Sequence, residues 1–221
     1  MPHWYTHMRN TIATFFDVIA PRRARTIRTQ KRAQADIPLT PAVHRLLGMD
    51  ITTIMDYRDT AVQDLIRSLK YDGSRHAARL CAQVLVDFLM EELSEEKAYS
   101  PRRILLVPMP LHASRLRERG FNQIDIVLDH LPIEWRNGST AAIAPHALIR
   151  IKQTRSQAHL SRADRIKNMQ DAFTVPAPDT IRDTHIYLLD DVTTTGATLK
   201  SAAHALRAAG AKVTPLALAR A

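Results

Sequence analysis

One segment, residues 186–198, constrains the fold of this chain more than any other. Its sequence is Ile-Tyr-Leu-Leu-Asp-Asp-Val-Thr-Thr-Thr-Gly-Ala-Thr. The four apolar residues at its start are typical of a strand that is buried on both faces of a parallel sheet. Two carboxylates follow, then a Thr/Gly turn, and then an alanine-rich pattern that predicts a helix over 197–209. A buried strand joined directly to a helix is the repeating unit of a parallel α/β sheet.

The rest of the chain alternates strand and helix patterns in the same way. Apolar runs bounded by Pro or turn residues predict strands, and apolar residues at helical spacing predict helices. The expected strands are 104–107, 147–151, 186–189 and 213–218, and the expected helices are 57–70, 75–93, 120–131 and 197–209. Pro215 lies in the last strand and predicts an edge position, because proline donates no ladder hydrogen bond. We therefore expect an α/β protein with a doubly wound, mainly parallel sheet.

The N-terminal region differs in charge from the remainder. The chain of 221 residues has a net charge of +9, and residues 1–35 hold seven Lys or Arg against a single acid, Asp17. We expect a basic N-terminal helix and arm over 1–41, followed by one α/β domain over 42–221. A basic arm favours polyanionic partners such as nucleic acid. The alternative is a solvated, partly disordered tail.

Composition excludes several classes of protein. Cys81 is the only cysteine, so the chain has no disulfide framework and no cysteine-based zinc ribbon, and its apolar neighbours predict a core position. No apolar run reaches the roughly 18 residues of a membrane span, and the apolar stretch 11–20 lacks the flanks of a secretory signal. We therefore expect a cytoplasmic protein. The glycine patterns of Walker-type and dinucleotide-binding loops are absent from the sequence.

The acids and the loop of residues 186–198 form the candidate site. Open α/β sheets bind ligands at the carboxyl ends of their strands, where Asp190 and Asp191 are expected. Ionised carboxylates accept hydrogen bonds from a vicinal diol or from the waters around Mg²⁺. Gly196 permits a tight turn, and the N–H groups that open the next helix favour a phosphate. The segment predicts a sugar-phosphate site; the alternative is a capped helix beside two merely exposed acids.

Two further segments have the composition of ligand-binding loops. Val-Pro-Met-Pro at 107–110 is followed by arginines at alternate positions, Arg115, Arg117 and Arg119, whose guanidinium groups match the oxygens of a pyrophosphate. Residues 154–173 are polar and basic without a clear strand pattern, as in a lid or binding loop. For both segments the alternative is a basic, solvated surface.

The 186–198 segment resembles the phosphoribosyl pyrophosphate (PRPP) motif of type I phosphoribosyltransferases. The resemblance implies that Asp190 and Asp191 bind the ribose 2′- and 3′-hydroxyls, while the loop binds the 5′-phosphate. The implied phosphate-binding residues are Thr194, Thr195, Gly196, Ala197 and Thr198. Many purine-salvage members have an acid where this chain has Thr194, and that acid accepts a proton near the nucleobase. Thr194 cannot do so at neutral pH, which argues against transfer to a purine base.

Three more blocks narrow the resemblance to the ComF family of competence-associated, phosphoribosyltransferase-like proteins. They are residues 57–73, ending in Lys-Tyr-Asp-Gly; residues 107–123, ending in Arg-Gly-Phe-Asn-Gln; and residues 154–173. With the PRPP motif they cover about residues 55–221. The resemblance implies four pyrophosphate-binding or lid residues, Arg117, Arg119, Gln157 and Arg165, and Mg²⁺ bound through PRPP. Many members carry an N-terminal cysteine-rich zinc module, but this chain has arginines there, so we expect no zinc.

The resemblance implies two functions of different classes. The first is displacement of pyrophosphate from C1 of PRPP by an unidentified nucleophile, with Asp190 and Asp191 as the catalytic residues that orient the ribose. The second is a non-enzymatic competence or DNA-uptake factor that binds single-stranded DNA or competence proteins through its basic N-terminus, or uses PRPP as a regulatory ligand. The sequence leaves open the acceptor, the occurrence of turnover and the oligomeric state.

Overall fold

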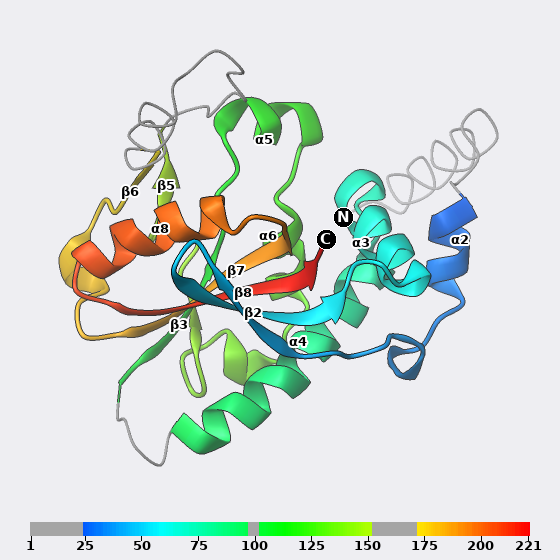
Figure 1. Cartoon of the computed structure of the whole chain (residues 1–221), viewed down its shortest axis with the longest axis horizontal. Coiled ribbons are helices and arrows are strands. Elements are labelled where there is room, and N and C mark those ends of the chain that lie inside the picture. Colours follow the sequence, from blue (N-terminus) through cyan, green and yellow to red (C-terminus); the bar gives the residue numbers. More distant parts are fainter. Residues whose placement is uncertain (1–23, 97–101, 152–171) are drawn as a thin grey trace, which may run out of the picture.

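A central six-stranded sheet organises the chain, of which the computed structural model describes residues 24–96, 102–151 and 172–221 (Figure 1). In order across the sheet, the strands are β1 (Ala42–Leu46), β2 (Met49–Asp56), β8 (Lys212–Arg220), β7 (His185–Thr193), β3 (Ile104–Pro108) and β4 (Ala142–Ile143). β1 and β2 form an antiparallel hairpin, and every other neighbouring pair is parallel. The expected mainly parallel α/β fold is confirmed.

Helices cover both faces of this sheet, as the doubly wound arrangement requires (Figure 1). One face packs against α3 (Thr60–Asp72), α4 (Arg75–Glu96) and α6 (Gln123–Asp129), and the other packs against α8 (Ala197–Ala208). Successive side chains of a strand point to opposite faces. Accordingly, Tyr187 and Leu189 of β7 join the first core, whereas Ile186 and Leu188 join the second. Cys81 of α4 is fully buried in the first core, as predicted.

The remaining elements are short. They are α2 (Ala24–Gln30), α5 (Ala113–Arg119), the 3₁₀ turns Gln34–Asp36, Ile133–Trp135 and Pro178–Thr180, and a separate antiparallel pair of β5 (Ile149–Arg150) and β6 (Phe173–Thr174). The strand predicted at 147–151 is therefore β5, outside the main sheet. No helix in the described part of the chain is both long enough and apolar enough to cross a membrane.

Helix α3 illustrates how local sequence positions a functional side chain. The Asp59 carboxylate caps its N-terminus by accepting hydrogen bonds from the N–H groups of Ala61 and Val62 at 2.7 and 3.2 Å. Gly73 ends the helix in the left-handed conformation at φ 56°. The buried stripe is Val62, Leu65, Ile66 and Leu69. The capped ends and the buried stripe fix where the last turn, and hence Lys70, lies.

The position predicted for the last strand is wrong. β8 lies inside the sheet, between β2 and β7, and not at an edge. Pro215 pairs with Leu188 of β7, while pairing with β2 starts only one residue later, at Leu216. The proline therefore lies where β8 has a neighbour on one side only. At such a position no ladder hydrogen bond is lost on the other side, so a proline is tolerated there as it is on an edge strand. The β1–β2 hairpin, for which the sequence analysis predicted no strands, supplies the extra neighbour.

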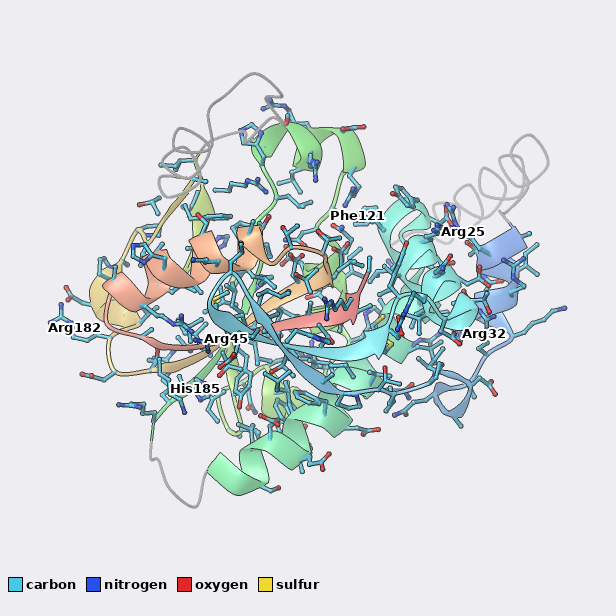
Figure 2. All side chains as sticks on the ribbon, in the orientation of Figure 1. Arg25, Arg32, Arg45, Phe121, Arg182 and His185 are labelled. Carbon is cyan, nitrogen blue, oxygen red and sulfur yellow. The ribbon has the colours of Figure 1, made fainter. Side chains whose placement is uncertain are left out.

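Part of the predicted basic arm packs on the domain. In α2, Thr26 and Thr29 are buried against α3. Arg28 and Arg32 both bind the Asp64 carboxylate, at 2.7 and 3.2 Å, and Arg25 binds Asp72 at 3.0 Å (Figure 2). Three of the seven N-terminal cations are thus paired with two acids of α3, which weakens the electrostatic case for a free polyanion-binding arm. Residues 1–23 lie outside the described residues, and the boundary at 41/42 stays a prediction.

Candidate functional site

A pocket of about 160 Å³ opens at the carboxyl ends of β3 and β7. This is the edge at which open α/β sheets bind ligands. Its walls come from several segments, and the polar lining residues are Lys70, Arg115, Arg119, Asn122, Gln123, Arg150, Asp190, Asp191 and Thr198. The structure therefore brings together the acids of the PRPP-like segment, one residue of its loop and the blocks that end at Gly73 and Gln123.

Those two blocks also touch each other directly. A Cβ atom placed on Gly73 would stand 3.2 Å from Cε1 of the Phe121 ring, so any other residue there would press on that ring. Figure 2 shows Phe121 beside the end of α3, below α5. The contact brings the last turn of α3 close to the first turn of α6 without any sequence proximity between them.

Asp190 and Asp191 point to opposite faces of β7, as neighbours in a strand do. Asp191 is 6% exposed, and its Oδ2 accepts a hydrogen bond from Gln123 Nε2 at 2.8 Å and lies 3.5 Å from Lys70 Nζ. Its Oδ1 accepts from the N–H of Val192 at 2.7 Å. Asp191 thus ties α3 and α6 to β7. The alternative that both acids are merely exposed is wrong.

Asp190 occupies a different electrostatic environment. It is half-buried, and its Oδ1 accepts a hydrogen bond from the N–H of Asp191 at 2.9 Å. Burial, followed by the charge of Asp191, raises the pKa of the Asp190 carboxyl to about 7, although Lys70 and Arg150 oppose the shift. Near neutral pH the carboxyl is therefore poised between its two protonation states. A bound cation or hydroxyl donor would favour the charged form.

The loop after β7 has the geometry of an anion site. Gly196 has a φ of 76° and is the N-cap residue of α8, so the cap position has no side chain to accept a hydrogen bond from the helix. The N–H of Ala197 donates to Thr195 Oγ1 at 3.4 Å. A Cβ on Gly196 would lie 2.5 Å from Ile51 Cδ1 and 3.0 Å from Leu46 Cβ, so the β1–β2 hairpin presses directly on this glycine. Only glycine fits both the backbone conformation and the space. Beyond Ala197, the N–H groups in the first turn of α8 have no acceptor from the N-cap residue, which is the arrangement that favours a bound anion.

The predicted phosphate residues are not all placed alike. Thr194 and Thr195 are exposed, Gly196 is buried and Ala197 begins α8. Thr198 is the member of this group that lines the pocket beside Asp190. The pocket and the loop are thus neighbouring parts of one surface, joined at Thr198.

The cationic wall differs in part from the prediction. Arg119 lines the pocket, and so does Arg115, whereas Arg117 does not. The reason is that α5 is a helix, in which residues four apart share a face and the residue between them points away. Alternate spacing would have brought all three together only in an extended loop. Gln157 and Arg165 lie outside the described residues.

Four further residues line the pocket that no sequence pattern had indicated as site residues: Lys70, Asn122, Gln123 and Arg150. Asn122 caps α6 by accepting from the N–H of Ile124 at 3.0 Å, and its Nδ2 donates to the carbonyl of Met109 at 3.0 Å, which fixes the loop after β3. Gln123 is buried, and its Oε1 finds no hydrogen-bond partner within the described part of the chain. An unsatisfied acceptor in a pocket wall is costly without a ligand donor. In the sequence, Lys70 lies near Gly73, and Asn122 and Gln123 lie near Gly120; polar residues beside turn glycines could have indicated a binding site.

The donor set suits Mg²⁺ only together with a ligand. Among the residues described, no three His, Cys, Asp or Glu side chains gather closely enough to hold a metal ion. Asp190 offers one carboxylate at the pocket, while Asp191 is already bound by Gln123 and Lys70. Mg²⁺ prefers one or two carboxylates plus phosphate oxygens and water. The residues present therefore fit a magnesium ion carried in on a diphosphate.

Comparisons with known proteins give relatives but no matching family model. DNA utilization protein YhgH of Salmonella typhimurium is 31% identical over 147 residues, which cover 66% of this chain and 61% of the relative. Competence protein ComFC of Streptococcus pneumoniae is 29% identical over 171 residues, covering 75% and 66%. The chain thus spans about three fifths of the length of the first relatives that it matches.

Among solved structures, a hypoxanthine phosphoribosyltransferase from Staphylococcus aureus matches with a TM-score of 0.37 and 13% identity, over 66% of this chain and 63% of that one. A TM-score and a sequence identity this low say nothing about the site. The sequence relatives carry the identification. The predicted resemblance is confirmed: this chain is a homologue, at about 30% identity, of the proteins named competence protein ComFC, competence protein F and YhgH.

Proposed function

We propose that this chain binds PRPP with Mg²⁺ and transfers the phosphoribosyl group with release of pyrophosphate. The observation that carries the proposal is one pocket that combines Asp190, Thr198 and the cations Lys70, Arg115 and Arg119 next to a helix N-terminus whose cap residue is a glycine. A sugar carrying a phosphate at one end and a diphosphate at the other is the ligand that this set of groups matches.

Each part of the ligand has a distinct set of partners in this proposal. The ionised Asp190 carboxylate accepts hydrogen bonds from the ribose hydroxyls, and Asp191 holds Lys70 and Gln123 in position. The N–H groups at the start of α8, with the threonines 194, 195 and 198, hold the 5′-phosphate. Arg115 and Arg119 lie on the side of the pocket that would receive the pyrophosphate.

The chemistry requires charge stabilisation more than proton transfer. Breaking the bond from C1 to the pyrophosphate oxygen builds positive charge on the ribose and negative charge on the leaving group, while the bond from C1 to the nucleophile forms. The carboxylate of Asp190 faces the developing positive charge, and the arginines and Lys70 face the negative charge. Mg²⁺, when bound to the diphosphate, neutralises part of the leaving charge.

Calorimetric titration with PRPP, in the presence and absence of Mg²⁺, tests the binding step. We expect saturable binding that needs Mg²⁺. It should weaken in Asp190→Asn, because a neutral amide cannot balance the charge of Mg²⁺ or of the ribose as the carboxylate does. Asp179→Asn is the matched control, since its side chain is 90% exposed and pairs with Arg182, away from the pocket. Equal PRPP affinity in wild type and Asp190→Asn would refute the assignment of this pocket.

A screen of acceptors then tests the transfer step. Pyrophosphate release from PRPP is measured with candidate nucleophiles, using the wild type and Asp190→Asn. Release that depends on an acceptor and on Asp190 supports catalysis. PRPP binding without any release would make the site a regulatory one.

A second candidate is a non-enzymatic role in handling single-stranded DNA, favoured by the names of the relatives and by the net charge of +9. Salt-dependent binding of an oligonucleotide that survives Asp190→Asn would support it. Lack of binding at low salt would exclude it. For either function we propose a cytoplasmic location.

A further inference from the structure

A second pocket, of about 480 Å³, lies where β1, β2 and β8 meet. It opens at the carboxyl ends of β2 and β8. β8 is the neighbour of β7 in the sheet (Figure 1). Its lining residues are Thr40, Ala42, His44, Thr53, Met55, Asp56, Arg58, Arg220 and Ala221. None of them lines the pocket at Asp190, so the two sites are separate.

Two of the charged side chains in this second pocket, Asp56 and Arg58, pair with each other, and Arg220 is not part of that pair. Asp56 is bound by Arg58, with Nη2 to Oδ2 at 2.7 Å and Nε to Oδ2 at 3.0 Å. That bond holds the pKa of the Asp56 carboxyl at about 2, so the pair stays ionised and neutral overall. Arg220 forms no ion pair with any acid among the described residues. Arg220 is therefore the guanidinium of this pocket that Asp56 does not bind.

The polar partner of Arg220 explains why this charge is available. Its Nη1 donates to His44 Nδ1 at 2.5 Å, and His44 Nε2 then donates to Thr53 Oγ1 at 2.9 Å. This chain of hydrogen bonds requires a neutral imidazole. Burial and the charge of Arg220 both lower the pKa of His44, which favours the same state. A guanidinium has five N–H donors, and this arrangement uses one of them.

We propose that this pocket binds a small organic molecule that carries a carboxylate or a phosphate, held by Arg220. Guanidinium groups bind both anions through two parallel hydrogen bonds. A cavity of this size lies within the range of small-molecule sites and is much larger than one inorganic ion needs. Met55 and Ala42 supply apolar wall for the body of the molecule, and the Thr53 and Thr40 hydroxyls supply polar contacts.

Three small probes separate charge from shape. Benzoate and phenyl phosphate carry the two anions on the same ring, and benzamide is the neutral match of benzoate. Nuclear magnetic resonance follows the imidazole of His44 and the side-chain Nε of Arg220 during titration of the full chain. We expect saturable shifts with benzoate or phenyl phosphate, and about tenfold weaker binding of benzamide. The stronger of the two anions tells which group the ligand carries.

Two variants and one control decide the outcome. Arg220→Gln removes the cation, and Arg58→Gln, at an exposed side chain, leaves the Asp56 charge uncompensated and repels the probe. We expect each to weaken binding about tenfold or more. Arg45→Gln is the control, because Arg45 lies on β1 but pairs with Asp50 outside the pocket. No saturable shift, equal binding of benzamide, or unchanged affinity in both pocket variants would overturn the proposal.

Discussion

Replacing Asp190 by Asn should stabilise the ligand-free protein while weakening its binding of PRPP. The pKa of the Asp190 carboxyl rises from 3.8 to about 7 on folding, so ionising this group costs free energy in the folded state. Between about pH 4 and pH 7 the folded state holds more protons than the unfolded chain. The free energy of unfolding of the wild type therefore falls as the pH rises through this window.

The size of the effect follows from the same shift. Three pKa units correspond to about 4 kcal/mol, which is an upper limit because the carboxyl is half-buried and coupled to Asp191. We expect the free energy of unfolding of Asp190→Asn to exceed that of the wild type by about 2 kcal/mol at pH 8 and by almost nothing at pH 4. For a chain of this length the gain corresponds to a rise in Tm of about 4–8 °C. The Asn side chain still accepts the hydrogen bond from the N–H of Asp191.

Thermal unfolding in phosphate-free buffer at pH 4 to 8 measures this gain, with Asp179→Asn as the exposed control. Adding PRPP and Mg²⁺ should reverse the order of the two proteins, because ligand stabilises only the form that binds it. A variant that is no more stable than wild type at pH 8 would refute the reasoning. So would a gain that does not change with pH.

Three further substitutions test separate parts of the site. Gly196→Ala should lower the free energy of unfolding by about 3 kcal/mol and weaken PRPP binding, because the added methyl group clashes at a position with an unfavourable φ. Gly48 has a similar φ of 77° but open space around it, so Gly48→Ala should lower the free energy of unfolding by only about 1 kcal/mol. Denaturant unfolding measures both values. Arg119→Gln should weaken PRPP binding about tenfold or more, and Arg117→Gln should change it less than about twofold; equal effects in calorimetry would refute the helical arrangement of α5. Lys70→Met leaves the buried carboxylate of β7 without its cation and should cost about 1–3 kcal/mol at pH 8, and unchanged stability would show that the hydrogen bond from α6 suffices.

Several properties of the fold were predictable from local sequence. The strand and helix around Asp190 follow from an apolar run and an alanine-rich pattern, and the strand at 104–108 and the helices at 60–72 and 75–96 lie close to the predicted ranges. The hairpin of β1 and β2 was missed, and with it the interior position of β8. Strand pairing depends on partners far apart in the chain. The presence of Pro215 therefore could not by itself tell whether its strand lies at the edge of the sheet or inside it.

The sequence by itself determined the chemical groups of the site: two acids at a strand end, a Thr/Gly loop before a helix, and arginines after a second strand. Tertiary structure alone decided how these groups divide their work. Alternation along β7 turns Asp191 towards Lys70 and Gln123 and leaves Asp190 half-buried beside the cationic wall. The folding of residues 113–119 into a helix selects Arg115 and Arg119 over Arg117. Burial and neighbouring charge, which set the pKa of Asp190, exist only once segments distant in sequence pack together.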